Sequence, residues 1–175
     1  MNKKEYKKRY ELIKMKNGEL ETRYKSYFDK GQHILKDKLK IKKGKLSKAA
    51  GARFEIKVRN YWENNGWILD KWTNNVDLEK NSLMPAKRKF NPFKRIMSIG
   101  TGFPDFIAIK PRKSRFHEVI GIEVKMKGLL SKEEKEKCRW YLNKRIFSKI
   151  LIAKKFSNGK KIGIEHIDFS KKWMK

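Results

Sequence analysis

Two apolar, β-branched runs that each carry a carboxylate constrain the fold of this chain most. The first run is Gly102–Ile109 and contains Asp105; the second is Gly121–Lys125 and contains Glu123. Short apolar runs beside glycine and proline are typical of buried strands. Alternate residues of a strand share a face, so Glu123 and Lys125 point the same way. If the two strands pair, two acids and one ammonium group meet at one place, which suits a divalent cation and a phosphodiester.

The charge of the chain is the second constraint. Its 175 residues include 47 Lys and Arg but 19 Asp and Glu, which gives a formal net charge of +28. So basic a chain favours a polyanionic partner, with nucleic acid as the first candidate. The single cysteine excludes an internal disulfide and a multi-cysteine zinc site. No apolar run approaches the roughly 20 residues of a membrane span, and we expect a cytoplasmic protein without a membrane partner.

The order of the expected elements predicts an α/β domain preceded by a basic extension. Residues 1–46 are predicted to form short basic helices separated by glycines, and residues 47–175 one domain. Within the domain we expect helices over 47–64 and 132–144 and an irregular basic insertion at 74–93. The expected strands lie at 67–72, 95–99, 105–109, 116–125, 147–153 and 162–167. This order predicts a central mixed β-sheet flanked by helices.

The basic extension admits two interpretations. Its apolar residues recur at helical spacing, as in Tyr6, Tyr10 and Ile13. Such stripes are typical of helices that pack on a neighbouring domain or on a second subunit. The alternative is an isolated nucleic-acid-binding arm, because basic residues far outnumber acidic ones in this segment.

An ordered set of motifs resembles the PD-(D/E)XK nuclease superfamily. The set comprises Glu55 in the first helix of the domain, Pro104-Asp105 opening a strand, and Glu123-Val124-Lys125 closing the next strand. Each motif alone is weak in a lysine-rich chain, but their order and context are more specific. Over about residues 48–155 the chain is most similar to archaeal Holliday-junction resolvases, whose opening helix carries a motif like Gly51–Glu55. It is also similar to virus-type replication-repair (VRR-NUC) nucleases, which share the Gly-x-Pro-Asp and Glu-x-Lys strands.

The resemblance implies a restriction-endonuclease-like core and a metal-dependent endonuclease that hydrolyses phosphodiester bonds in DNA. It gives catalytic roles to Glu55, Asp105, Glu123 and Lys125, with Asp105, Glu123 and the Val124 carbonyl as metal ligands. Mg²⁺ prefers such oxygen ligands, and Mn²⁺ is the alternative cofactor. The metal would polarise the phosphate and lower the pKa of a water, while Lys125 would stabilise the charge of the transition state. The resemblance also implies branched DNA, such as a four-way junction, as the substrate and a homodimer as the assembly.

Ordinary structural roles compete with these assignments. Glu55 could be a surface acid paired with Arg59, Asp105 a turn acid, and Lys125 a solvated strand end. Many VRR-NUC relatives carry Gln at the helical position of Glu134, to which no role is assigned. Five further residues are candidates for contacts with DNA phosphates: Arg53, Lys94, Arg95, Thr101 and Lys127. The alternative is a generic basic surface for the basic residues and a plain loop for Thr101. Two other functions stay open: a restriction- or repair-type nuclease for linear duplex or flap DNA, and a non-catalytic basic nucleic-acid-binding protein.

Overall fold

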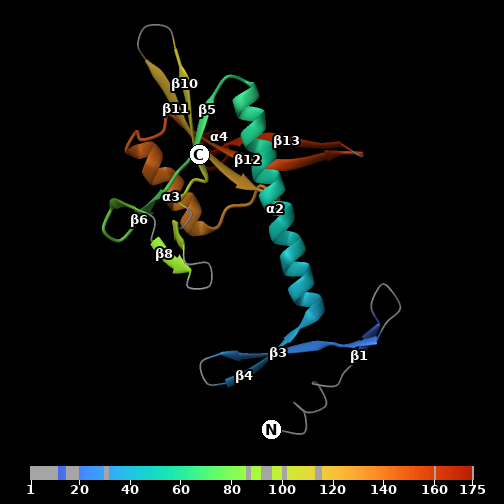
Figure 1. The fold of residues 1–175 in the computed structure, drawn as a ribbon. Coiled ribbons are helices and arrows are strands. Elements are labelled where there is room, and N and C mark those ends of the chain that lie inside the picture. Colours follow the sequence, from blue (N-terminus) through green and yellow to red (C-terminus); the bar gives the residue numbers. More distant parts are fainter. Residues whose placement is uncertain are drawn as a thin grey trace. The chain divides into compact units, whose positions relative to one another are not determined.

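The chain folds into two compact units, Met1–Ala52 and Arg53–Lys175. The computed structural model describes residues 12–14, 20–29, 32–85, 88–91, 96–99, 102–112, 116–159 and 161–174 (Figure 1). Within these ranges, no helix combines the length and the apolar character that crossing a membrane requires.

The first unit contains strands where short helices were predicted for residues 1–46. Its strands are β1 (Leu12–Lys14), β2 (Leu20–Thr22), β3 (Tyr24–Asp29) and β4 (Gln32–Asp37). β1 pairs with β2 and β3 with β4, in two antiparallel ribbons. The helical prediction is therefore wrong for these residues. Two runs rich in aromatic and aliphatic residues on either side of a glycine are a hairpin signal, which the helical spacing of the same residues obscured.

Helix α2 (Lys38–Asn64) begins well before position 47, where it was predicted to start. Asp37 caps it, because its Oδ1 accepts hydrogen bonds from the amides of Leu39 at 2.8 Å and Lys40 at 3.2 Å. The end of the helix at Asn64 agrees with the prediction. The glycines within the helix do not interrupt it, although glycine lowers helix propensity.

The second unit is built on a five-stranded mixed sheet, which confirms the predicted sheet type. The strands, in spatial order, are β13 (Lys161–Asp168), β12 (Lys149–Asn158), β11 (His117–Lys125), β10 (Phe106–Pro111) and β5 (Ile68–Lys71). β11 and β12 are parallel, and the other neighbouring pairs of this sheet are antiparallel. Helix α3 (Lys132–Asn143) connects the parallel pair, as such a crossover requires. A short helix, α4 (Phe169–Trp173), follows β13.

The segment 74–93 contains regular strands, so the prediction of an irregular insertion is wrong. β6 (Asn74–Asp77) pairs with β7 (Ser82–Pro85), and β8 (Arg88–Asn91) pairs with β9 (Ile96–Ile99). The turn between β6 and β7 is organised by Asp77, whose Oδ1 accepts hydrogen bonds from two following amides. Asn74, Pro85 and Asn91 lie at the ends of these strands, where two-stranded ribbons tolerate such residues.

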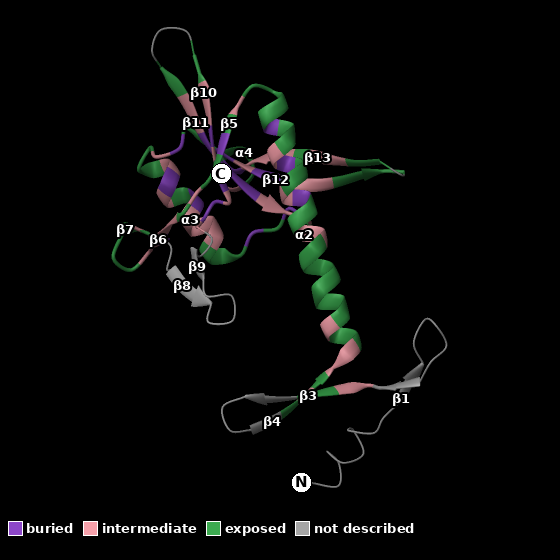
Figure 2. Ribbon diagram, in the orientation of Figure 1, coloured by how far each residue is buried: buried purple, intermediate pink, exposed green. Residues whose placement is uncertain are grey.

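The buried apolar residues of the sheet belong to two core clusters, and Figure 2 shows the buried parts of its strands in purple. One core cluster includes Phe54 and Trp62 of α2 with Ile122 of β11. The other includes Tyr141 of α3 with residues of β12 and α4. Because alternate residues of a strand face opposite sides, Ile122 faces α2 while Glu123 faces α3.

Candidate active site

Asp105 and Glu123 meet where β10 begins and β11 approaches its end. Phe106 pairs with Ile122 across the two strands, which places Asp105 opposite Glu123. The amide of Asp105 donates a hydrogen bond to Glu123 Oε2 at 3.0 Å. The amide of Val124 donates one to Asp105 Oδ2 at 2.8 Å. Each carboxylate is therefore held by a backbone amide beside the other carboxylate.

Two glycines allow the segment that carries Asp105 to pack against the sheet. A Cβ on Gly102 would lie 2.3 Å from the carbonyl oxygen of Trp72, so a larger residue does not fit there. A Cβ on Gly121 would lie 2.8 Å from Cγ of Pro104. The amide of Trp72 also donates a hydrogen bond to the carbonyl of Asp105 at 3.2 Å. Gly102 therefore admits the backbone of the chain itself.

Lys125 lies between two carboxylates. Its Nζ is 2.9 Å from Glu123 Oε1 and 2.6 Å from Glu134 Oε1. Glu134 belongs to a capping box at the start of α3: its Oε2 accepts a hydrogen bond from the Ser131 amide, and the Ser131 hydroxyl accepts one from the Glu134 amide. The Ser-x-x-Glu spacing is typical of a capping box but gives no sign of the contact with Lys125, so Glu134 is a site residue that sequence reasoning missed.

Glu55 pairs with Lys71, the last residue of β5. The Oε2–Nζ distance is 2.8 Å. The alternative pairing of Glu55 with Arg59 is wrong, because Arg59 pairs with Glu63 at 2.8 Å. Glu55 lies close enough to Asp105 for its charge to act on that carboxyl group. No sequence signal singled out Lys71, since one more lysine at a strand end is unremarkable in so basic a chain.

Burial and repulsion shift the two strand carboxylates toward the protonated form. Burial, followed by the nearby charge of Asp105, raises the pKa of Glu123 to about 8. Burial also raises the pKa of Asp105, with the charge of Glu55 acting in the same direction and the Val124 amide opposing it. Glu123 is only 4% exposed. A cation between two such acids would offset their repulsion and favour their charged forms.

Lys125 keeps its positive charge in this setting. Burial alone would lower its pKa, but the hydrogen bond to Glu134 and the charge of Glu123 outweigh burial and raise the pKa above its ordinary value. Burial would likewise raise the pKa of Glu134, but its hydrogen bonds with Lys125 and Ser131 lower it. A fixed ammonium group therefore lies between Glu134, whose pKa is lowered, and Glu123, whose pKa is raised and which a further cation would help to ionise.

The donor set of the site suits a hard divalent cation. The carboxylates of Asp105 and Glu123 and the carbonyl of Val124 would supply oxygen atoms only. Mg²⁺ is often held by one or two carboxylates together with waters and substrate phosphates. Across the described part of the chain, no three His, Cys, Asp or Glu residues form a group that could hold a metal.

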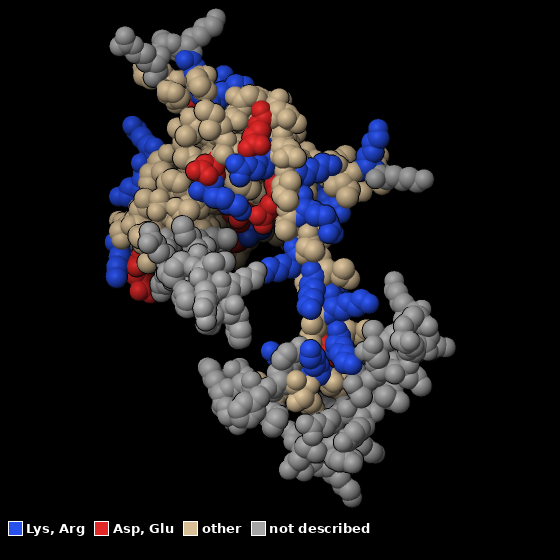
Figure 3. Space-filling model, viewed as in Figure 1, with Lys and Arg blue, Asp and Glu red and all other residues tan. Residues whose placement is uncertain are grey.

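Of the predicted phosphate-contact residues, two fall within the described structure. Arg53 in α2 and Lys127 in the turn after β11 are both exposed. Lys94, Arg95 and Thr101 lie outside the described residues. Figure 3 shows acidic side chains gathered in a few places on the face it draws, with Lys and Arg side chains beside them.

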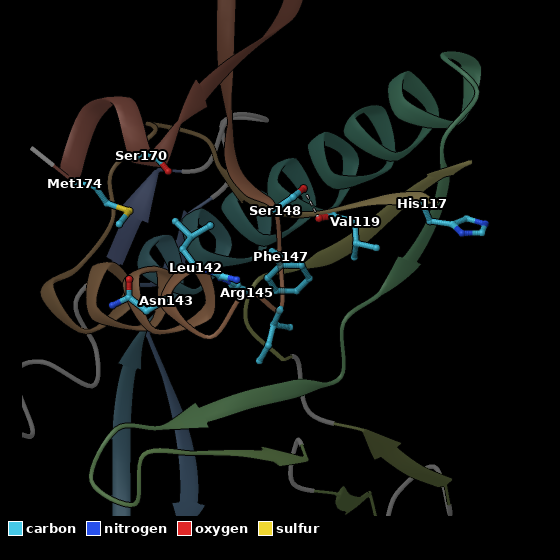
Figure 4. Close-up of a pocket in the computed structure, with 10 residues that line it drawn as sticks. His117, Val119, Leu142, Asn143, Arg145, Phe147, Ser148, Ser170 and Met174 are labelled. Carbon is cyan, nitrogen blue, oxygen red and sulfur yellow. Dashed lines mark hydrogen bonds between the residues drawn. The ribbon is translucent and has the colours of Figure 1, made fainter. Parts of the chain in front are cut away.

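The cavity drawn in Figure 4 lies away from this cluster. It has a volume of about 560 Å³, and His117, the first residue of β11, lines it. Lys125 is the last residue of the same strand, roughly 25 Å further along at 3.3 Å per residue. Among the described residues, no carboxylate lines the cavity; its residues are His117, Val119, Leu142, Asn143, Arg145, Ile146, Phe147, Ser148, Ser170 and Met174. The candidate active site is thus separate from this cavity.

Comparison with known proteins finds no matching family model, no matching curated protein and no matching solved structure. The functional assignment therefore depends on the residues of the site themselves. These are the acids Glu55, Asp105, Glu123 and Glu134 and the basic residues Lys71 and Lys125.

Proposed function

We propose that this chain is a metal-dependent DNA endonuclease of the PD-(D/E)XK type. The observation that supports it most is the pair of Glu123, buried in β11, and Asp105, partly buried just before β10, with Lys125 2.9 Å from Glu123. Burying two acids side by side is unfavourable unless a cation compensates for them. A protein that only binds nucleic acid gains nothing from carboxylates that would face a phosphate. In a nuclease, these acids would bind the cation that assists phosphodiester hydrolysis.

Each residue of the cluster has a different role in the proposed reaction. A Mg²⁺ ion held by Asp105, Glu123 and the Val124 carbonyl would supply Lewis-acid polarisation of the phosphate and a more acidic water, with Mn²⁺ as the alternative. Lys125 orients the attacking water and stabilises the negative charge that grows on the phosphate. Glu55, paired with Lys71, lies near enough to Asp105 to complete the acidic cluster around a cation.

Branched DNA is the proposed substrate, and a homodimer the proposed assembly. Both follow from the resemblance to Holliday-junction resolvases. The net charge of +28 supports DNA as the partner, because contacts between Lys or Arg and phosphates do not depend on base sequence. Resolution of a four-way junction needs two symmetric nicks, which a dimer with two-fold symmetry would make.

Cleavage of a labelled four-way junction and of a linear duplex with the same arm sequence tests the proposal. Each DNA is incubated with Mg²⁺ and, separately, with EDTA. We expect paired, metal-dependent nicks in the junction, and their loss in the Asp105→Asn variant. Cleavage of both DNAs would indicate a nuclease for linear duplex or flap DNA. Binding of both DNAs without cleavage in Mg²⁺ or Mn²⁺ would contradict a catalytic role.

A further inference from the structure

We propose that the first half of helix α2 is a contact surface for the phosphate backbone of double-stranded DNA, and that DNA binding strengthens its helical conformation. The surface, called the lysine segment below, comprises residues 42–49. The proposal extends the proposed nuclease function, because it assigns a substrate contact to residues outside the carboxylate cluster.

The lysine segment is basic and exposed on every side. Every residue from 42 to 49 is exposed, and Figure 2 shows the same for this part of α2. The segment contains no acid, and none occurs in α2 before Glu55. Among the described residues, none forms an ion pair with the four lysines of the segment. They are Lys42, Lys43, Lys45 and Lys48.

The lysine segment is a poor helix on its own. Lys45 lies three positions from both Lys42 and Lys48, and like charges at this spacing destabilise a helix. Gly44 and Gly51 each cost about 0.5–1 kcal/mol relative to alanine in a helix interior. A Cβ at either glycine would meet nothing within 4 Å, so close packing does not require glycine there. Neither burial nor charge within the segment therefore favours its helical state.

A DNA backbone would reverse the unfavourable charge of the segment. Duplex DNA carries about one negative charge per 1.7 Å of its axis, and residues 42–48 of a helix span about 9 Å. Several phosphates can therefore neutralise the lysines at once. Lysine is a flexible point charge and suits contacts that do not depend on sequence. A helix that only bridges two parts of a protein would also be exposed all round, but this role explains neither the lack of acids nor the two glycines.

Neutralising the lysines tests the charge contact directly. Binding of a labelled duplex is measured by fluorescence anisotropy at several salt concentrations, with the Asp105→Asn substitution in every protein to prevent cleavage. In one variant, the four lysines of the segment are replaced by glutamine. In the control variant, four exposed lysines of the second unit are replaced by glutamine instead: Lys144, Lys161, Lys171 and Lys172. Both lose the same charge. We expect the segment variant to bind more weakly, with a slope of log K against log salt reduced by about 0.9 for each lost phosphate contact. Equal affinities and slopes in the two variants would overturn the proposal.

Replacing the glycines tests the coupling to helix formation without changing charge. The Gly44→Ala, Gly51→Ala double variant should populate the helix more fully before binding. We expect it to bind DNA several-fold more tightly, because less ordering remains to be done, with an unchanged salt slope. Circular dichroism should show helix content rising on DNA binding in the parent protein and rising less in the double variant. An equal rise in both, or none in either, would overturn the coupling. These measurements need no cleavage, so they remain interpretable if the nuclease proposal fails.

Discussion

The two halves of helix α2 are stabilised in different ways. Its second half buries Phe54, Val58 and Trp62 in a core cluster with the sheet, and it carries Glu55 near Asp105. The lysine segment in the first half is exposed throughout. The difference matches the two proposed roles, because cleavage and binding make different demands on a structure. Cleavage needs carboxylates that a packed core holds in place, whereas attraction to a polyanion acts over a Debye length of about 8–10 Å and tolerates mobile side chains.

The largest effect should come from removing one strand carboxylate. Asp105→Asn and Glu123→Gln should each lower Mg²⁺-dependent cleavage by at least about a thousandfold. A metal supplies several kcal/mol of charge stabilisation, and each ~1.4 kcal/mol is a factor of ten in rate. Single-turnover rates on a four-way junction measure the loss.

Glu118→Gln is the matched control for these variants. Glu118 lies near the other end of β11 and pairs with Arg112, so its substitution should leave the cleavage rate unchanged. An equal loss in this control, or full activity in Asp105→Asn, would contradict the assignment of the site.

Truncating a side chain should change the free energy of unfolding by different amounts in the two halves of α2. Phe54→Ala should lower the free energy of unfolding by about 3–5 kcal/mol, because it removes a buried aromatic ring. Leu46→Ala removes a side chain that is 61% exposed and should change it by less than about 0.5 kcal/mol. Urea denaturation of both variants measures the difference. A large loss in Leu46→Ala would mean that the lysine segment is packed against other residues.

The raised pKa of Glu123 should make the free energy of unfolding decrease as pH rises. In the unfolded chain its carboxyl ionises near the ordinary value of 4.5, whereas the folded carboxyl stays protonated until about pH 8. Between these values the unfolded state binds fewer protons, so the free energy of unfolding decreases with pH. Thermal melts across this window, without divalent metal, should show a smaller decrease in Glu123→Gln than in the wild type. An equal or steeper decrease in the variant would contradict the raised pKa.

The smallest effect on catalysis should come from replacing Glu134, whose carboxylate contacts Lys125. Glu134→Gln keeps a capping box, because glutamine also serves at this position, but it removes a charge from Lys125. We expect about a tenfold decrease in kcat, as for other positioning contacts, with little change in melting temperature. Glu133→Gln, one position earlier, is the control and should change neither quantity.

The sequence predicts best those parts of the fold whose signals are local. The strands that carry Asp105 and Glu123 are short apolar runs with breakers beside them, and the structure has β10 and β11 there. The start of α3 follows from Ser131 and the acids of its first turn. The juxtaposition of the two carboxylates then requires only that the two strands pair.

The remaining features depend on contacts between residues far apart in the chain or on ambiguous spacing. Lys71 meets Glu55 only because β5 lies at the edge of the sheet beside α2, and no local pattern encodes that contact. The early start of α2 depends on Asp37, whose Oδ2 also pairs with Arg23 at 3.1 Å. The strands of the first unit were mistaken for helices because aromatic and aliphatic residues at mixed spacing fit both periods.

Mn²⁺ binding tests the central claim, that Asp105 and Glu123 form a metal site, most directly. Free Mn²⁺ is followed by electron paramagnetic resonance as protein is titrated, and circular dichroism confirms that each variant is folded. We expect saturable binding by the wild type and by Glu118→Gln, and its loss in Asp105→Asn and Glu123→Gln. Equal binding by all four proteins would contradict the metal site.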